Sequence, residues 1–316
     1  MTRWVLQRIA VSIALAWVVA TMVFLALHLI PGDPAELLLS AGNVAPDPSA
    51  VAELHQKLGL DRPLIDQYLT FLARLAHGDL GNSLVDDYPV TREIALRLPR
   101  TLELICAGAL LAVLLGIPTG TLAAVYRGLF DRIASVATAL LLAVPVFVLG
   151  TLLILLFAQT LRVMPAGGYT PIAQNPVQHF ALLALPATAI AMGLAAVVFR
   201  MTRASVLDAL SRDFVRTARA KGVSPLGVLV RHVLRNALIP VLTVLGLHMG
   251  TLLGGTVLIE YVFNWPGLST PLLRAVEARD YPMVVGIVLT VSSLFLVINL
   301  VMDILYALLD PRVRAS

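Results

Sequence analysis

Long runs of apolar residues alternate with shorter polar stretches along most of the chain. Because a bilayer core requires about 20 helical residues to cross it, each apolar run of that length predicts a membrane-spanning helix. Six runs qualify, at residues 9–30, 104–126, 133–161, 180–199, 237–259 and 281–302. The pattern therefore predicts an all-α integral membrane protein with six transmembrane helices.

One polar stretch, residues 31–100, is much longer than the others and carries ten acidic and six basic side chains. A connection of this length predicts a small extracytoplasmic subdomain rather than a turn. Inside it, apolar positions 64, 65, 68, 69, 72 and 75 share one helical face. Asp61 is predicted to cap this helix and Gly78 to end it. The helix is expected to lie either on the membrane interface or against the rest of the protein.

The expected organisation is then an N-terminus with the first span (residues 1–30), the subdomain (31–100) and a five-helix core (101–316). The core contains a basic segment at residues 204–236. The first span could instead be a cleaved signal peptide. Its apolar run is too long for that and no A-x-A-like site follows it, so a retained span is predicted.

Composition and charge agree with the membrane class and orient the spans. The chain is 59% hydrophobic and 13% charged, whereas soluble domains carry about 25% charged residues. Fourteen Lys and Arg lie on the side of the N-terminus and nine on the other side. The positive-inside rule therefore predicts that both termini are cytoplasmic. The net charge of +4 is explained by this topology and does not indicate nucleic-acid binding.

The most charged segment, residues 213–240, lies between the fourth and fifth spans. Against one acid, Asp213, it places Arg216, Arg219, Lys221, Arg231 and Arg235. Asp213 is predicted to cap a short helix that Gly222 ends, and Ser224 followed by Pro225 predicts the start of a second short helix. Membrane topology alone would explain the charge but not this succession of helix signals. The segment therefore favours a docking element for another protein.

Small residues and span-end acids form a second set of candidates. Helix packing or pathway roles are expected for Gly116 and Gly120 in the second span, and for Gly246, Gly250 and Gly254 in the fifth. Internal packing, a subunit contact and a translocation wall all remain open for them. Glu103, Glu260 and Asp303 lie near the ends of spans and are candidates for the pathway. Because no acid lies near the middle of a span, energy is expected to come from another protein rather than from ion coupling.

Motifs for catalysis and cofactors are absent from the sequence. The six histidines show no H-x-x-x-H or H-E-x-x-H spacing, and the chain has neither a G-x-x-x-x-G-K-[ST] nor a G-x-S-x-G motif. The single cysteine, Cys106, excludes an internal disulfide. The sequence therefore predicts no catalytic residue, metal site or cofactor in this chain, and no enzyme activity of its own.

Nine short strings, in this order, carry a resemblance to a known family. They are I-P-G-D-P at 30–34, L-G-L-D-R-P-L at 58–64 with Gln67-Tyr68, G-D-L-G-N-S at 78–83, R-L-P-R-T-L-E-L at 97–104, R-T-A-R-A-K-G at 216–222, H-V-L-R-N-A-L-I-P-V at 232–241, E-Y-V-F-N-W-P-G at 260–267, R-D-Y-P at 279–282 and D-P-R-V-R at 310–314. Together they resemble the inner-membrane permease subunits of binding-protein-dependent ABC importers, in the dipeptide/oligopeptide/nickel group.

The resemblance implies a type I importer permease fold and a cytoplasmic motif that couples the permease to an ATPase subunit. It places this motif at Arg216, Thr217, Ala218, Arg219, Ala220, Lys221 and Gly222. The helix signals at Asp213, Ser224 and Pro225 complete the predicted coupling residues. This chain departs from the broad importer pattern E-A-A-x-x-x-G. Arg216 stands where that pattern has Glu, Thr217 stands where it has the first Ala, and its terminal proline would fall at Arg235.

The implied partners are a second homologous permease, two ATPase subunits that hold ATP and Mg, an extracytoplasmic binding protein and the lipid bilayer of the bacterial inner membrane. The implied function is ATP-driven import of short peptides by alternating access, with this chain forming half of the pathway. Nickel chelate, glutathione and other peptide-like solutes are alternative cargoes. A stand-alone channel or ion-coupled transporter is a less favoured alternative, and a membrane-bound enzyme would need a catalytic cluster that the sequence lacks.

Overall fold

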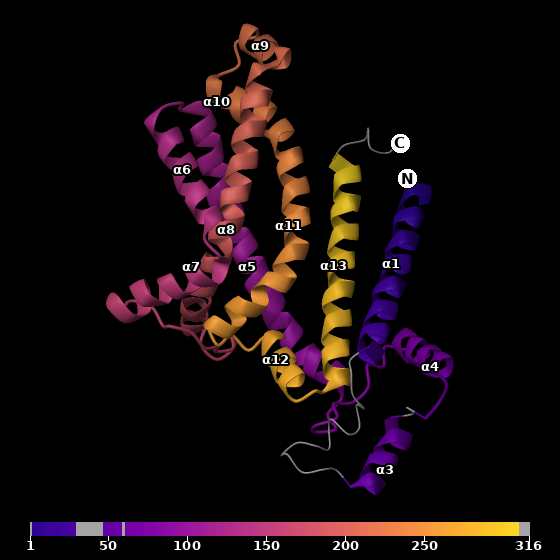
Figure 1. Ribbon diagram of the computed structural model, residues 1–316. Helices are drawn as coiled ribbons and strands as arrows, with labels where there is room; N and C mark the ends of the chain where they lie inside the picture. Colours follow the sequence, from indigo (N-terminus) through magenta and orange to yellow (C-terminus); the bar gives the residue numbers. More distant parts are fainter. Residues whose placement is uncertain (1, 30–46, 59–60, 310–316) are drawn as a thin grey trace. The chain divides into compact units, whose positions relative to one another are not determined.

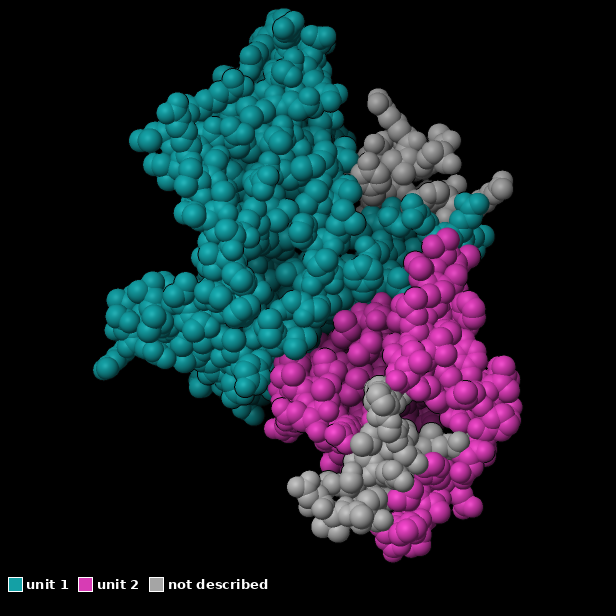
Figure 2. Space-filling view, in the orientation of Figure 1, with its two compact units in different colours: residues 1–9, 100–266, 294–316 teal, residues 10–99, 267–293 magenta. Residues whose placement is uncertain are grey.

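The computed structural model describes residues 2–29, 47–58 and 61–309, and every regular element in these ranges is helical. The family-like strings at 30–34 and 310–314, and residues 59–60 of a third string, lie outside the described residues. The chain divides into two compact units (Figure 2). Unit 1 comprises residues 1–9, 100–266 and 294–316, and unit 2 comprises residues 10–99 and 267–293.

Within the described ranges, five helices are long and apolar enough to cross a membrane, and a bent pair can supply a sixth span. Figure 1 labels the long ones: α1 (Thr2–Leu29), α5 (Val90–Val125), α8 (Pro176–Ser211), α11 (Arg235–Val262) and α13 (Tyr281–Leu309). Each of the six predicted runs coincides with one of these helices or with the bent pair. The all-helical membrane fold expected from the sequence is confirmed.

The predicted third span is broken in the middle. It consists of α6 (Leu129–Ala143), α7 (Val146–Leu153) and the π-helical segment η1 (Ile154–Thr160), and the chain bends by 105° between α6 and α7. Pro145 causes the break, because proline lacks the N–H that would continue the helix and disfavours a helical conformation in the residue before it. That residue, Val144, is extended, with φ −96° and ψ 127°.

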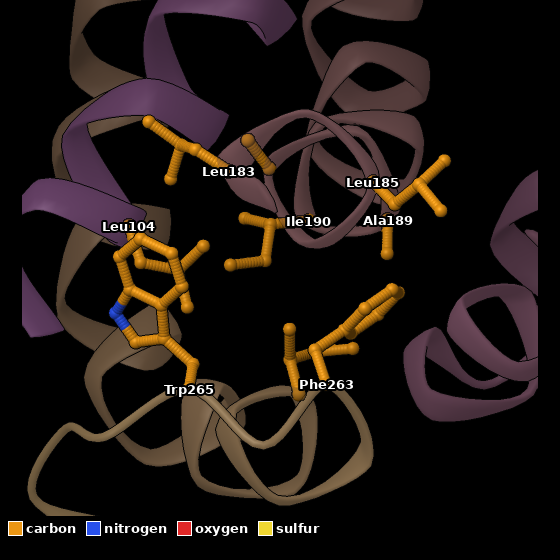
Figure 3. Close-up of a cluster of buried hydrophobic side chains, with 9 residues drawn as sticks. Leu104, Leu183, Leu185, Ala189, Ile190, Phe263 and Trp265 are labelled. Atoms are coloured by element: carbon orange, nitrogen blue, oxygen red, sulfur yellow. The ribbon is translucent and has the colours of Figure 1, made fainter. Parts of the chain in front are cut away.

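Helix α8 is central to unit 1, where it packs against α5, α6, α7 and α11. Near one end of α8 lies a buried cluster from several helices, drawn in Figure 3. Phe263 and Trp265 reach from the end of α11 toward Leu104 of α5 and Ile190 of α8. The indole Nε1 of Trp265 donates a 3.0 Å hydrogen bond to the carbonyl of Arg100. This bond satisfies the polar atom of an otherwise apolar anchor.

Two glycines of α5 allow the helix backbones to approach closely. A Cβ at Gly116 would lie 2.8 Å from the side chain of Val198, and one at Gly120 would lie 2.7 Å from the carbonyl oxygen of Phe199. Both contacts are with α8 and both are far below van der Waals distance. The α5–α8 contact therefore depends on the absence of side chains at these two positions.

In unit 2, helix α4 (Leu64–Ala76) packs on α1. The hydroxyl groups of Thr21 and Tyr68 lie 2.7 Å apart, and the ring centroids of Phe24 and Tyr68 lie 5.2 Å apart with the rings tilted by 60°. The structure thus places this amphipathic helix against the rest of the protein. Its remaining apolar positions, Leu64, Ile65 and Leu69, are exposed. Unit 2 also contains α3 (Pro48–Leu58) and α12 (Ser269–Glu277).

The predicted start of α4 is wrong by two residues. Its N-cap is Pro63 rather than Asp61, and no side chain caps the helix. Because the residue before a proline disfavours helical dihedrals, the helix begins only after Pro63. The predicted end is confirmed: the C-cap is His77 and Gly78 follows with φ +73°.

The string at residues 78–83 forms a tight polar turn after α4. Asp79 accepts hydrogen bonds from Arg74 Nε at 2.9 Å and from the Gly81 N–H at 2.8 Å. The bond from Arg74, followed by that from Gly81, holds the pKa of Asp79 below its ordinary value. A carboxyl with a depressed folded-state pKa stabilises the fold above its unfolded-state pKa, and that contribution is lost as pH falls through the folded-state pKa.

Candidate functional site

The basic segment of unit 1 begins with a short helix, α9 (Asp213–Ala220), whose C-cap is Lys221 and which Gly222 terminates as predicted. The N–H of Val223 bonds to the carbonyl of Ala218 at 3.2 Å, and the N–H of Gly222 bonds to that of Arg219 at 3.0 Å. These two bonds form a Schellman motif, which needs a left-handed residue after the C-cap. Gly222 supplies it with φ +78°.

The predicted cap of α9 is wrong by one position. Arg212 is the N-cap, it makes no side-chain capping bond, and Asp213 is the first helical residue. The Asp213 carboxylate lies in the first turn, 3.5 Å from Arg216 Nη1. An acid in the first turn still compensates the partial positive charge of the helix N-terminus, so the same residue acts through the helix dipole instead of a cap.

The second predicted helix begins where the sequence places it but is not short. Ser224 is its N-cap, with Oγ accepting a 3.2 Å bond from the Gly227 N–H, and Pro225 is the first helical residue. The chain then continues through α10 (Pro225–Gly227) and the π-helical segment η2 (Val228–Leu234) directly into α11. No proline and no left-handed glycine interrupts residues 226–239. The second helix of the basic segment is therefore the extension of a membrane span.

One face of α9 is anchored to the membrane core of unit 1. Val215 and Ala218, three positions apart, are 1% and 6% exposed and pack against a cluster from α8 and η2. That cluster includes Val206, Val228 and Val233. Of the residues assigned to coupling from the sequence, Ala218 thus faces inward and has a packing role.

The opposite face of α9 and the turn after it are exposed. The exposed coupling candidates are Asp213, Arg216, Thr217, Arg219, Ala220, Lys221, Gly222, Ser224 and Pro225. Leu226, which the sequence reasoning missed, is 70% exposed beside Pro225. Across the described part of the chain, Arg219 and Lys221 make no ion pair, and the Arg216–Asp213 pair is almost fully exposed. Exposed pairs contribute little, so this face presents cations and one apolar tip to solvent.

A second charged contact holds α6 against α8 in unit 1. Arg203 donates two hydrogen bonds to the Asp131 carboxylate, at 2.5 and 2.6 Å. This bidentate geometry combines specificity with strength. From the sequence, both residues are expected only to be loop charges. The available signal is Asp131, the single acid of a loop that otherwise carries Arg127 and Arg132.

We expect Asp131→Asn to lower the stability of the purified permease complex by about 1–3 kcal/mol, because it removes the charged acceptor of two hydrogen bonds. The matched control is Asp208→Asn, since Asp208 pairs with Arg212 but both side chains are 63% exposed. Thermal unfolding in detergent measures both. Equal melting temperatures for the two variants would contradict a structural role for the Asp131–Arg203 pair.

The span-end acids each have a partner in unit 1. Glu260 is 1% exposed and accepts a 2.5 Å hydrogen bond from Thr101. Glu103 Oε1 lies 2.8 Å from Nε2 of the buried His179, at ion-pair distance although not aligned as a hydrogen bond. Asp303 lies 3.2 Å from Arg8. These contacts tie helix ends together, and the structure does not bring the three acids to one site.

The glycines of α11 separate into two kinds. A Cβ at Gly246 would lie 2.8 Å from Met302, and one at Gly250 would overlap the ring of Phe295, both on α13. A Cβ at Gly254 would meet no atom within 4 Å. Gly246 and Gly250 therefore sit in an intramolecular helix contact of unit 1, whereas Gly254 does not.

Metal binding finds no support in the described ranges, where no three His, Cys, Asp or Glu side chains are grouped to hold an ion. What the site does contain is an anchored helix with an exposed cationic face, joined by a short turn to a second helix that continues into a membrane span.

Comparison with known proteins agrees with this arrangement. Two family models match, the binding-protein-dependent transport system inner membrane component over residues 116–315 and its N-terminal counterpart over residues 1–105. The chain is 42% identical over 315 residues to the glutathione transport system permease protein GsiC of Escherichia coli K12 and of Shigella dysenteriae, covering 99% of each chain.

Among solved structures, an inward-facing MetNI methionine ABC transporter matches with a TM-score of 0.56 at 17% identity, covering 69% of this chain and 96% of that one. This likeness concerns the fold alone. The family matches confirm the resemblance read from the nine strings and identify a multi-pass protein of the bacterial inner membrane. The chain belongs to the inner-membrane permease components of binding-protein-dependent ABC importers.

Proposed function

We propose that this chain forms half of the translocation pathway of an ATP-driven importer for short peptides and peptide-like solutes. Its relatives at 42% identity are named as glutathione transport permeases, and glutathione is a tripeptide-like solute. Glutathione is therefore the first cargo to test within this class. A nickel chelate stays an alternative cargo, to be tested beside glutathione.

The proposed complex contains a second homologous permease, two ATPase subunits that bind ATP and Mg, and an extracytoplasmic binding protein. Both termini and α9 are proposed to be cytoplasmic, following the distribution of Lys and Arg. Residues 31–100 are proposed to face the binding protein. The family membership supports these assignments, since its members act as permease components of binding-protein-dependent systems.

The observation that carries the coupling role is the construction of α9. Its inner face is packed by Val215 and Ala218, and its outer face presents Arg216, Arg219 and Lys221. The helix follows α8 after a single residue, and a short turn at residues 221–224 joins it to the helix that continues into α11. A force applied to the outer face by an ATPase subunit would therefore move the ends of two membrane helices together. Closure of the ATPases would favour one state of the pathway through such differential contacts.

The test is purification of the tagged permease with its co-expressed neighbours, followed by uptake in proteoliposomes. We expect the two permeases and the ATPase to co-purify, and uptake of glutathione or tripeptides to require ATP and the binding protein. Vesicles holding this chain alone are expected to show no flux. Flux through the isolated chain would replace this proposal with the channel or ion-coupled alternative.

A further inference from the structure

A cavity of about 230 Å³, open on one side, lies in unit 1 between the end of α6, the start of α7 and the middles of α8 and α11. The bend at Pro145 opens it, because Val144 and Val146 line it where the chain turns away by 105°. Its walls are aliphatic except for two residues of α11, His248 and Thr256. The proposed function gives this cavity no role.

Two glycines keep this cavity open. Gly193 of α8 and Gly255 of α11 line it, and a Cβ at either would meet no atom within 4 Å. Glycines such as Gly120 and Gly246 differ, because a Cβ there would collide with a neighbouring helix. Close helix packing therefore does not account for the glycines at 193 and 255, and they leave space beside the histidine.

His248 is the only titratable residue that lines the cavity. Over the ranges that the structure describes, its ring makes no hydrogen bond and no ion pair, and the hydroxyl of Thr251 bonds to its backbone carbonyl rather than to the ring. Thr256 bonds to the carbonyl of Leu253 in its own helix at 3.1 Å. A polar ring in an apolar span is costly without a partner, and such residues commonly mark a transport pathway.

We propose that His248 and the cavity beside it form a contact site for the carboxylate-bearing end of the cargo during its passage through the membrane. This inference rests on the proposed function, because peptide-like solutes with a free C-terminus carry a carboxylate. The imidazole can donate to that carboxylate, and the aliphatic walls suit a neighbouring side chain. Whole small ligands occupy pockets of about 300–1,000 Å³, so this smaller cavity takes one end of the cargo. A lipid acyl chain is a poorer occupant, because it offers the imidazole no hydrogen bond.

The first experiment compares two substitutions of the ring in the complete importer, reconstituted with its binding protein and supplied with glutathione or a tripeptide. His248→Phe keeps the bulk and removes the donor, whereas His248→Gln keeps a donor. We expect His248→Phe to reduce uptake per ATP hydrolysed about tenfold, the effect of one hydrogen bond to a charged group. His248→Gln should recover most of it, and binding-protein-stimulated ATP hydrolysis should persist in both.

The second experiment fills the cavity from the neighbouring wall. Gly255→Leu places a side chain in the cavity, and Leu258→Phe is the control, because Leu258 lies one turn further along α11, is 50% exposed and does not line the cavity. We expect uptake to fall at least as far in Gly255→Leu as in His248→Phe, and to stay near the wild-type value in Leu258→Phe.

The outcomes separate this site from the proposed function. If the wild-type importer takes up the cargo and the His248→Phe and Gly255→Leu variants take it up equally well, the proposed site is wrong. The proposed importer function is unaffected by that result. Loss of the second permease from purified His248→Phe complexes would assign the ring to a subunit contact and also overturn the site. A wild-type complex that moves neither glutathione nor tripeptides overturns the proposed function and this site with it.

Discussion

Replacing Gly222 by valine is expected to abolish ATP-driven uptake while leaving the membrane helices folded. Gly222 has φ +78°, and a Cβ there would meet no atom within 4 Å, so the cost is backbone strain and not a clash. A left-handed conformation costs an L-residue about 1–2 kcal/mol and is worse for a β-branched one. The strain would open the Schellman turn and free the end of α9, which the proposed coupling requires to be fixed.

The control for this experiment is Gly222→Asn, because asparagine tolerates the left-handed region. We expect uptake and ATPase co-purification close to wild type for asparagine and a strong loss of both, or of uptake alone, for valine. Uptake is measured in proteoliposomes that contain the whole importer. Normal uptake by the valine variant would show that the geometry of the turn does not matter for coupling.

Replacing Gly120 by valine is expected to have the largest effect on stability. The new Cβ would lie 2.7 Å from the carbonyl oxygen of Phe199 and 3.0 Å from Thr202. A backbone oxygen inside a helix cannot turn away as a flexible side chain can, so α5 and α8 must separate. Overpacking typically costs about 1–3 kcal/mol and sometimes more, and we expect the upper part of that range.

The matched control is Gly254→Val, in the same kind of membrane helix but facing open space. It should be neutral or slightly stabilising, since glycine is a poorer helix former than valine. Melting temperature and expression level of the purified permease measure both variants. A Gly120→Val protein as stable as the Gly254→Val protein would contradict the observed α5–α8 contact.

Much of the fold is predictable from the sequence, because membrane helices obey strong local rules. A run of about 20 apolar residues has few alternatives to a helix in lipid. The turn at Gly222 and the cap at Ser224 were predicted for a similar reason, since each depends on the backbone or side-chain chemistry of one residue. The start of α9 was wrong by one position, because Arg212 and Asp213 are both compatible with the first turn.

The features that local rules could not predict depend on residues far apart in the chain. Glu260 bonds to Thr101 across 159 positions, and Arg203 to Asp131 across 72. The size of the bend at Pro145 and the cavity beside His248 likewise depend on how α6, α8 and α11 pack. A proline in the sequence predicts a break in the helix but not the angle of the bend. A histidine in the middle of a span does not indicate what it contacts until the packing around it is known.

Site-directed cross-linking tests the central claim, that α9 is the surface on which the ATPase acts. In a Cys106→Ser background, Lys221→Cys places the only cysteine on the exposed turn after α9, and Val177→Cys places it near the opposite end of α8, about 50 Å away along the helix. With a cross-linker added to the assembled importer, we predict a permease–ATPase product from Lys221→Cys and none from Val177→Cys. A Lys221→Cys residue that stays uncross-linked and freely labelled in the complete complex would contradict the account.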